Sequence, residues 1–432
     1  MAARPDPAAP AERRRARRAA PPEVRLGLGA NLPQFTLLVA VNAFVGAMVG
    51  VERSALPLVG HDDFGIVSST ALLSFIVAFG LAKAITNLGA GALAERVGRR
   101  RLLVLGWALA LPIPILIGSA SSWSWIVAAN VLLGLNQGLA WSMTVLMKID
   151  LVGPRRRGLA LGLNESAGYG GVALAAAATG WLAAEYTPQT VLVWSAAAIA
   201  VVGFLLSVAL VRDTGRHVAL EQEGHAAGGR APSLSRSFAS VTYRVPALRA
   251  ASGTGLVNNL NDALAWGLVP VFLSTRGASV AEIGIVAGVY PAVWGLGQIV
   301  AGGLSDRTGR RPLIVLGMLV QAVALVVLAA SGGELGLAVG AAVLLGIGTA
   351  LVYPTLIAAV SDAVAPVARA SAVGVYRFWR DMGYVLGGLG AGVAADALGL
   401  SGAILVVAAA TALAGVWALV DMAPRRAAAH SR

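Results

Sequence analysis

Apolar runs long enough to cross a lipid bilayer repeat along almost the whole of this sequence. A helix of about 20 apolar residues spans the hydrocarbon core of a membrane. Hydrophobic residues make up 57% of the 432 positions and charged residues only 12%, whereas a soluble domain carries about 25% charged residues. A soluble enzyme built around one core is therefore excluded, and we expect an all-α integral membrane protein.

The apolar runs predict twelve transmembrane helices. Their expected ranges are 33–58, 66–94, 101–120, 123–148, 158–184, 190–211, 248–273, 281–304, 312–331, 335–360, 370–396 and 400–421. The second and fifth of these expected spans are rich in Gly and Ala, which allow helices to pack closely in lipid.

The positions of Lys and Arg support this number of spans and give an expected orientation. Cytoplasmic loops of membrane proteins hold an excess of Lys and Arg. With both termini placed in the cytoplasm, 27 of the 33 basic residues fall in cytoplasmic segments, and only Arg276 falls in an outer loop. We therefore expect a multi-pass protein of the cell membrane (plasma or bacterial inner membrane) with cytoplasmic N- and C-termini.

The same positions account for the net charge of +12, which in a soluble protein would point to nucleic acid. Here the basic residues mark loop ends, so we expect no nucleic-acid partner, and the basic N-terminal tail is expected to touch anionic lipid headgroups. The expected organisation is a basic cytoplasmic tail at 1–30, a six-helix bundle at 31–212, a central cytoplasmic loop at 213–247, a second six-helix bundle at 248–422 and a cytoplasmic tail at 423–432.

Two stretches of the first half return in the second half. The ten residues from Gly91, GALAERVGRR, return 211 residues later as GGLSDRTGRR from Gly302. A second match at an offset of 212 residues pairs Gly134, Trp141 and Asp150 with Gly346, Tyr353 and Asp362. Two matches at nearly one offset predict a duplicated six-helix unit, and parallel repeats of this kind describe one transporter architecture.

At these residues the chain resembles the major facilitator superfamily, over residues 31–421. The family's signature is a Gly, an acidic–Arg pair, then Gly and two basic residues, and it stands here twice. The resemblance implies two bundles that rock about a central site lined by spans 1, 4, 7 and 10. It also implies a gating motif whose acids latch one conformation, although the same charges could serve only to enforce topology. The motif comprises Gly91, Glu95, Arg96, Gly98, Arg99, Gly302, Asp306, Arg307, Gly309 and Arg310.

The chain departs from the drug–proton antiporters of that superfamily. Those exporters have an Arg in span 4 followed by x-x-Gln-Gly, whereas here Gly134 precedes Gln137 and Gly138. Their Gly-Pro signature in span 5 is also absent. The resemblance implies a secondary transporter of a small solute by alternating access. We expect it to be coupled to protons, and we favour export over uptake. The alternatives are uptake or exchange of a small organic or inorganic anion, and a sensor or scaffold that no longer transports.

Charged and polar residues inside the expected spans are candidate sites, because each is costly in lipid unless it faces a cavity or a partner. Arg377, Arg380 and Asp381 share one face of the eleventh span, where Arg377 and Asp381 could pair one turn apart. Arginine suits an anionic substrate group, but an ion-pair network between spans 7 and 11 would explain the same charges. The candidate substrate-binding residues are Asn42, Gln137, Trp141, Asn258, Asn261, Tyr353, Arg377 and Arg380.

Energy coupling has three candidate residues, Asp262, Glu165 and Asp381. No histidine lies in an expected span, so a transported proton would be carried by a carboxylate, and Asp262 is favoured because it lies near mid-membrane. Sodium coupling is the alternative. Trp141 and Tyr353 occupy equivalent places in the two repeats and could form an aromatic pair across a cavity.

Residues that other chemistries require are missing from the sequence. There is no cysteine, neither lysine follows a glycine as a phosphate-binding loop requires, and all four histidines lie in loops or tails. We therefore expect no enzyme activity, no metal and no cofactor. The expected partners are a small-molecule substrate, a proton and the lipid bilayer, and the chain is expected to be a monomer.

Overall fold

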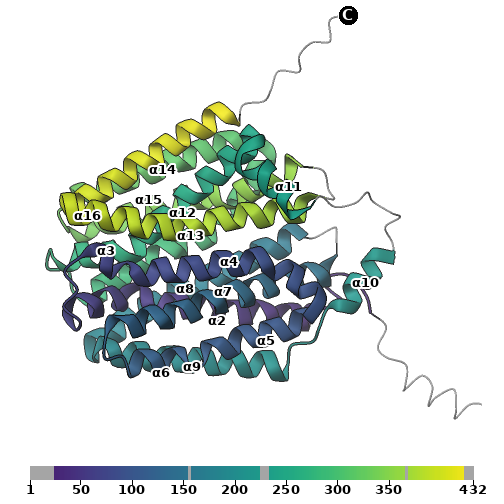
Figure 1. The fold of residues 1–432 in the computed structure, drawn as a ribbon, viewed down its shortest axis with the longest axis horizontal. Helices are drawn as coiled ribbons and strands as arrows, with labels where there is room; N and C mark the ends of the chain where they lie inside the picture. Colours follow the sequence, from purple (N-terminus) through teal and green to yellow (C-terminus); the bar gives the residue numbers. More distant parts are fainter. Residues whose placement is uncertain (1–23, 154–156, 224–232, 365–367, 423–432) are drawn as a thin grey trace, which may run out of the picture.

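The computed structural model describes residues 24–153, 157–223, 233–364 and 368–422. Within these ranges every regular element is a helix. Figure 1 shows the helices of the first half, in purple and blue, grouped on one side of those of the second half, in green and yellow. The all-helical fold class expected from the sequence is confirmed for these residues.

Two helices of the first half end at glycines with left-handed backbone angles. Gly98 (φ 94°) separates α4 from α5, and Gly153 (φ 70°) follows the last residue of α7. The helices are α2 (Leu32–Asp62), α3 (Ser69–Leu72), α4 (Ser74–Val97), α5 (Arg99–Ala110), α6 (Ile113–Gly118), α7 (Trp123–Val152), α8 (Arg157–Glu185) and α9 (Pro188–Ala209).

The second half repeats this pattern. Gly309 (φ 87°) separates α13 from α14, 211 residues after the equivalent break at Gly98. The helices are α12 (Pro246–Ser274), α13 (Val280–Thr308), α14 (Arg310–Ala330), α15 (Leu335–Asp362) and α16 (Arg369–Asp421).

Three short helices lie in the described part of the segment that joins the halves. They are α10 (Gly215–Glu223), α11 (Leu234–Ala239) and the π-helix η2 (Ser240–Arg244). His217 of α10 lies 3.2 Å from the Asn31 side-chain oxygen, and burial lowers the pKa of its imidazole. The start of the joining segment therefore docks on the first half.

Nine helices in the described ranges are long and apolar enough to cross a membrane. The difference from twelve has three sources. The apolar part of α4 is short (Ser74–Ala90), and α12 carries three asparagines and Asp262, which lower its hydropathy. The third is α16, which joins the last two expected spans through one non-helical residue, Gly399 (φ 74°), where Figure 1 shows the chain doubling back. Twelve crossings and cytoplasmic termini stay predictions.

The two halves meet along α8 with α13, α4 with α16, and α2 with α12. Where α8 crosses α13 the backbones almost touch, because an ideal Cβ on Gly180 would lie 2.5 Å from Gly284 Cα. Near that end of the molecule α3 begins beside the turn of α16 (Figure 1), and Asp396 accepts hydrogen bonds from Ser69 and Thr70. We call this end, with residues 63–70 and 396–400, the α3 end; it is the end predicted to face outwards.

Candidate functional site

Four aromatic rings form a continuous layer where the two halves meet. The ring centroid of Tyr169 in α8 lies 5.3 Å from that of Trp141 in α7 and 3.6 Å from that of Trp294 in α13. Trp294 lies 5.2 Å from Tyr353 in α15, which is 5.9 Å from Tyr169. Trp141 and Tyr353 are therefore connected through Tyr169 and Trp294 rather than paired directly.

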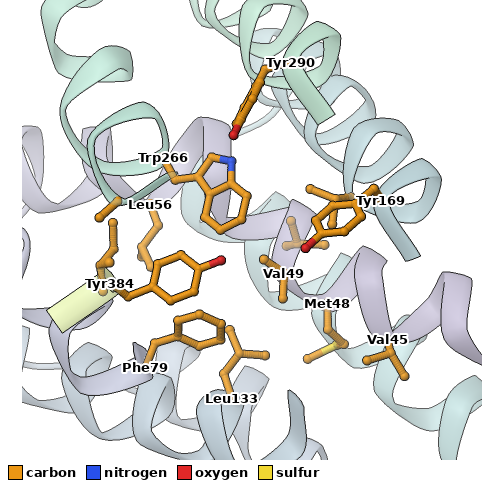
Figure 2. Close-up of a cluster of buried hydrophobic side chains, with 14 of the residues drawn as sticks. Val45, Met48, Val49, Leu56, Phe79, Leu133, Tyr169, Trp266, Tyr290 and Tyr384 are labelled. Atoms are coloured by element: carbon orange, nitrogen blue, oxygen red, sulfur yellow. The ribbon is translucent and has the colours of Figure 1, made fainter. Parts of the chain in front are cut away.

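Asp262 of α12 lies fully buried beside this layer. The Tyr290 hydroxyl donates to one of its carboxylate oxygens, and the Tyr384 hydroxyl lies 3.3 Å from the other. Tyr384 also stacks on Trp266 at 5.6 Å and packs against Phe79 at 5.4 Å, as Figure 2 shows. Two neutral hydroxyls thus hold the carboxylate, and none of the described cations pairs with it.

Arg380 and Asp381 form a buried ion pair in α16. Arg380 Nε and Nη2 lie 2.9 and 2.5 Å from one Asp381 oxygen, and Nη1 donates to the Tyr353 hydroxyl. Asn87 of α4 lies 2.5 Å from the other Asp381 oxygen, so the pair also links the two halves. Asp381 therefore pairs with its neighbour and not with Arg377, whose Nε has no hydrogen-bond acceptor among the described residues.

Glu165 of α8 is held by donors of the first half. Trp141 Nε1 and the Asn164 amide each lie 3.0 Å from the same Glu165 oxygen. Asn42 donates to the Asn164 backbone carbonyl at 2.7 Å, and Gln137 donates to a backbone carbonyl of α2 at 2.8 Å. Asn42 and Gln137 are fully buried, so they support the helices behind Trp141.

Asn258 and Asn261 of α12 face the interior of the second half. Gln321 of α14 lies 3.0 Å from Asn258 and 2.7 Å from Asn261, and Thr411 donates to Asn261 at 2.7 Å. Asp262, the next residue, points instead towards α13 and α16. These three polar residues of α12 therefore meet two different sets of neighbours.

Two buried cations, Arg53 and Lys83, are held by aromatic rings. The Arg53 guanidinium carbon lies 4.5 Å from the Trp266 ring centroid and 5.3 Å from that of Phe79. None of its three nitrogens has a hydrogen-bond acceptor in the described part of the chain. Lys83 contacts the same Phe79 ring at 5.3 Å. Such contacts compensate part of the cost of burying a cation.

Two arginines of the gating motif, Arg99 and Arg310, form ion pairs within their own half. Arg99 Nε lies 2.8 Å from Asp150, and Arg310 Nε lies 3.0 Å from Asp362. These ion pairs are equivalent in the two repeats. The other described residues of the motif lie near the junctions of α4 with α5 and of α13 with α14; they are Arg96, Gly98, Gly302, Arg307 and Gly309. The structure does not describe the side chains of Glu95 and Asp306 or the surroundings of Gly91. The latch therefore stays a prediction.

Three residues of the site, Trp266, Tyr290 and Trp294, carry no signal in the sequence motifs. Tyr290 and Trp294 stand 211 residues after Phe79 and Lys83, which is the offset of the first internal match. Following that offset through the second span would have singled them out.

Comparison with known proteins places this geometry in context. A family model described as the Major Facilitator Superfamily matches residues 35–253 and 251–432. A Cupriavidus pinatubonensis protein described as a probable 4-methylmuconolactone transporter is 30% identical over 263 residues, 59% of this chain and 56% of that protein. The Escherichia coli inner membrane transport protein YajR is 40% identical over 98 residues, 22% of each chain. The matched segments thus span about half or less of these relatives.

Solved structures share the fold at low sequence identity. The nucleoside transporter NupG superposes with a TM-score of 0.72 at 12% identity, covering 91% of this chain and 100% of that one. A point mutant of the same transporter gives a TM-score of 0.74 at 13% identity, with 89% and 99% covered.

Proposed function

Because this chain belongs to the Major Facilitator Superfamily, a family of membrane transporters, we propose that it carries a small organic solute by proton-coupled alternating access. The observation that carries the proposal is the central layer between the halves. Aromatic rings and charged groups from both halves converge there, and buried charges in a membrane interior mark substrate and ion pathways.

The substrate contacts that we propose are Trp141, Tyr169, Tyr353 and Arg380. Trp141 is half-buried, and the other three keep 4–5% of their surface exposed. Trp294, by contrast, is fully buried in the same layer. The exposed edges of these side chains are the part of the layer that a solute could reach.

The hydrogen bonds between the halves support an inward-facing conformation. Among the described residues these bonds join Asp396 to the start of α3, Asn87 to Asp381, and Ser166 to the Gly295 carbonyl. All three sets lie at the α3 end or near the middle of the helices. A solute would therefore enter or leave this conformation from the opposite end, which is the predicted cytoplasmic side.

Proton coupling is assigned to Asp262, which two tyrosine hydroxyls hold inside the protein. The test uses proteoliposomes, an imposed pH gradient and radiolabelled 4-methylmuconolactone, the compound named for one relative. We expect Asp262→Asn to lose accumulation driven by the gradient while keeping solute exchange at equal pH. The matched control is Asp63→Asn, at an exposed loop carboxylate. Undiminished accumulation by Asp262→Asn would remove this residue from the mechanism, and accumulation driven by sodium alone would replace the proton.

Export is the direction that we propose, because the sequence resembles bacterial exporters of drugs and metabolites. The same solute assayed in right-side-out and everted vesicles separates export from uptake. Uptake or exchange of an anion is the second candidate, and the cations of the central layer favour it. A chain that binds solute but gives no flux in either vesicle would be the sensor or scaffold instead.

A further inference from the structure

Lys83 of α4 is a buried ammonium group that the protein does not neutralise by direct contact. Its Nζ lies 5.3, 5.4 and 5.7 Å from the ring centroids of Phe79, Tyr384 and Trp141. None of the described residues forms a hydrogen bond or an ion pair with it. An ammonium group has three N–H donors, and the ring faces satisfy its charge only in part.

Each acid around Lys83 already has another partner, and one oxygen of Glu165 is left without a donor among the described residues. Asp381 pairs with Arg380, Asp262 accepts from two tyrosine hydroxyls, and Glu165 accepts from an indole and an amide. Arg380 is bound by Asp381 through two nitrogens and by a tyrosine through the third. The cations near this layer that no described acid pairs with are Lys83, Arg53 and Arg377, and Lys83 is the one that lies against the Trp141 ring.

The second half shows that the fold does not need a cation at this place. Lys83 and Trp141 of the first half correspond to Trp294 and Tyr353 of the second, at the offsets of the internal repeat. The contacts correspond as well, because Lys83 lies 5.7 Å from Trp141 and Trp294 lies 5.2 Å from Tyr353. An aromatic ring fills the equivalent space, so the lysine is not a packing requirement.

We propose that Lys83 binds the anionic group of the substrate, and that the substrate is a small carboxylate with a flat unsaturated ring. Lys83 keeps 8% of its surface exposed, unlike Arg53, which is fully enclosed. Beside it, Trp141 and Tyr169 offer aromatic surface to a ring, since flat unsaturated groups stack on such faces. This inference rests on the proposed transport function and names the class of its solute.

The test measures binding to the purified full-length chain by ligand-induced change in its thermal unfolding temperature. The probes are benzoate and 4-methylmuconolactone, each compared with a neutral counterpart, benzamide and the methyl ester. We expect at least one carboxylate to stabilise the wild type and its neutral counterpart not to. Lys83→Met should weaken the apparent affinity for that carboxylate about tenfold or more, because a charge-assisted hydrogen bond is lost.

Two matched variants separate Lys83 from other cations. Lys148→Met removes the only other lysine, which lies in the same half and donates to the Leu38 carbonyl at 3.1 Å. Arg377→Met removes a cation predicted from the sequence as an anion site. We expect both to keep the carboxylate response. Loss of the response in Arg377→Met with retention in Lys83→Met would overturn the proposal.

A second measurement needs no variant, because the chain contains two lysines. Acylation of lysine side chains is followed by mass spectrometry with and without the carboxylate. We expect the carboxylate to slow modification of Lys83 and to leave Lys148 unchanged. Equal rates at Lys83, or stabilisation by the neutral compounds alone or by none of the probes, would refute the assignment. Solute flux in proteoliposomes tests transport separately, so transport of a neutral solute would leave the proposed function standing without this inference.

Discussion

Replacing Asp396 with Ala should release the α3 end and shift the protein towards an outward-open conformation. One oxygen of this carboxylate lies 2.6 Å from the Ser69 backbone nitrogen. The other lies 2.9 Å from the Ser68 hydroxyl, 3.1 Å from the Thr70 nitrogen and 2.7 Å from the Thr70 hydroxyl. An acid of the second half thus caps the helix start of the first, and these bonds exist only while the two ends are together.

The size of the effect follows from this contact. Loss of a capping side chain costs about 0.5–2 kcal/mol, and the exposure of Asp396 places the effect in the lower part of that range, at about 0.5–1 kcal/mol. The cost falls on the closed state alone. The ratio of open to closed molecules at the α3 end should therefore rise about 2- to 5-fold.

The absence of cysteine makes this shift measurable with spin labels. Cysteines at Val67 and Leu398, which are 91% and 63% exposed, place one label on each half at the α3 end. Pulsed electron–electron double resonance should show a population at longer distance that is larger in Asp396→Ala than in the wild type. Labels at Val67 and Trp125, both in the first half, give the control, and Asp63→Ala tests a neighbouring exposed carboxylate. An unchanged distance distribution in Asp396→Ala would show that the cap does not hold the halves together.

The remaining predictions concern the seam between the halves and the repeated ion pairs. Gly284→Leu should force the two halves apart at the α3 end, because a Cβ at this position would lie 2.7 Å from Gly180 Cα. The spin labels at Val67 and Leu398 would measure the change, and an unshifted distance between them would contradict the prediction. Asp150→Asn should lower the unfolding temperature more than Asp362→Asn, because the first carboxylate side chain is 10% exposed and the second 58%, and exposed ion pairs contribute little to stability. Equal losses would mean that burial does not set the strength of these pairs.

The features that could be predicted from the sequence are those that follow from the lipid environment and from the internal repeat. Hydropathy indicated the all-helical class, and the repeated signature identified the family, because both record a property of whole segments. The arginine that pairs with Asp381 could not be predicted in this way. Periodicity places Arg377 and Arg380 on one helix face, but the side-chain rotamer and the cross-half contact with Asn87 decide which arginine the acid meets.

The site in the second half shows the same limit. Asn258, Asn261 and Asp262 fall within an arc of about 100° on their helix, and such an arc covers two neighbours in a bundle. The asparagines bond to Gln321, while the aspartate bonds to tyrosines of other helices. Which neighbour a polar residue meets is a property of the packing, and the sequence of a single helix does not contain it.

The close passage of α8 over α13 bears on how fast the halves can move. Gly180 and Gly284 meet backbone to backbone, and Gly288 faces Ala173 and Ala177 along the same seam. Interlocked large side chains would have to change rotamer before two helices could slide or roll. At the α3 end of this seam the facing side chains are no larger than a methyl group and offer no such obstacle, whereas nearer its middle the Tyr169 and Trp294 rings stack across it. The rate of conformational exchange should then depend on that ring stacking and on the polar contacts that open and close on either side of the seam.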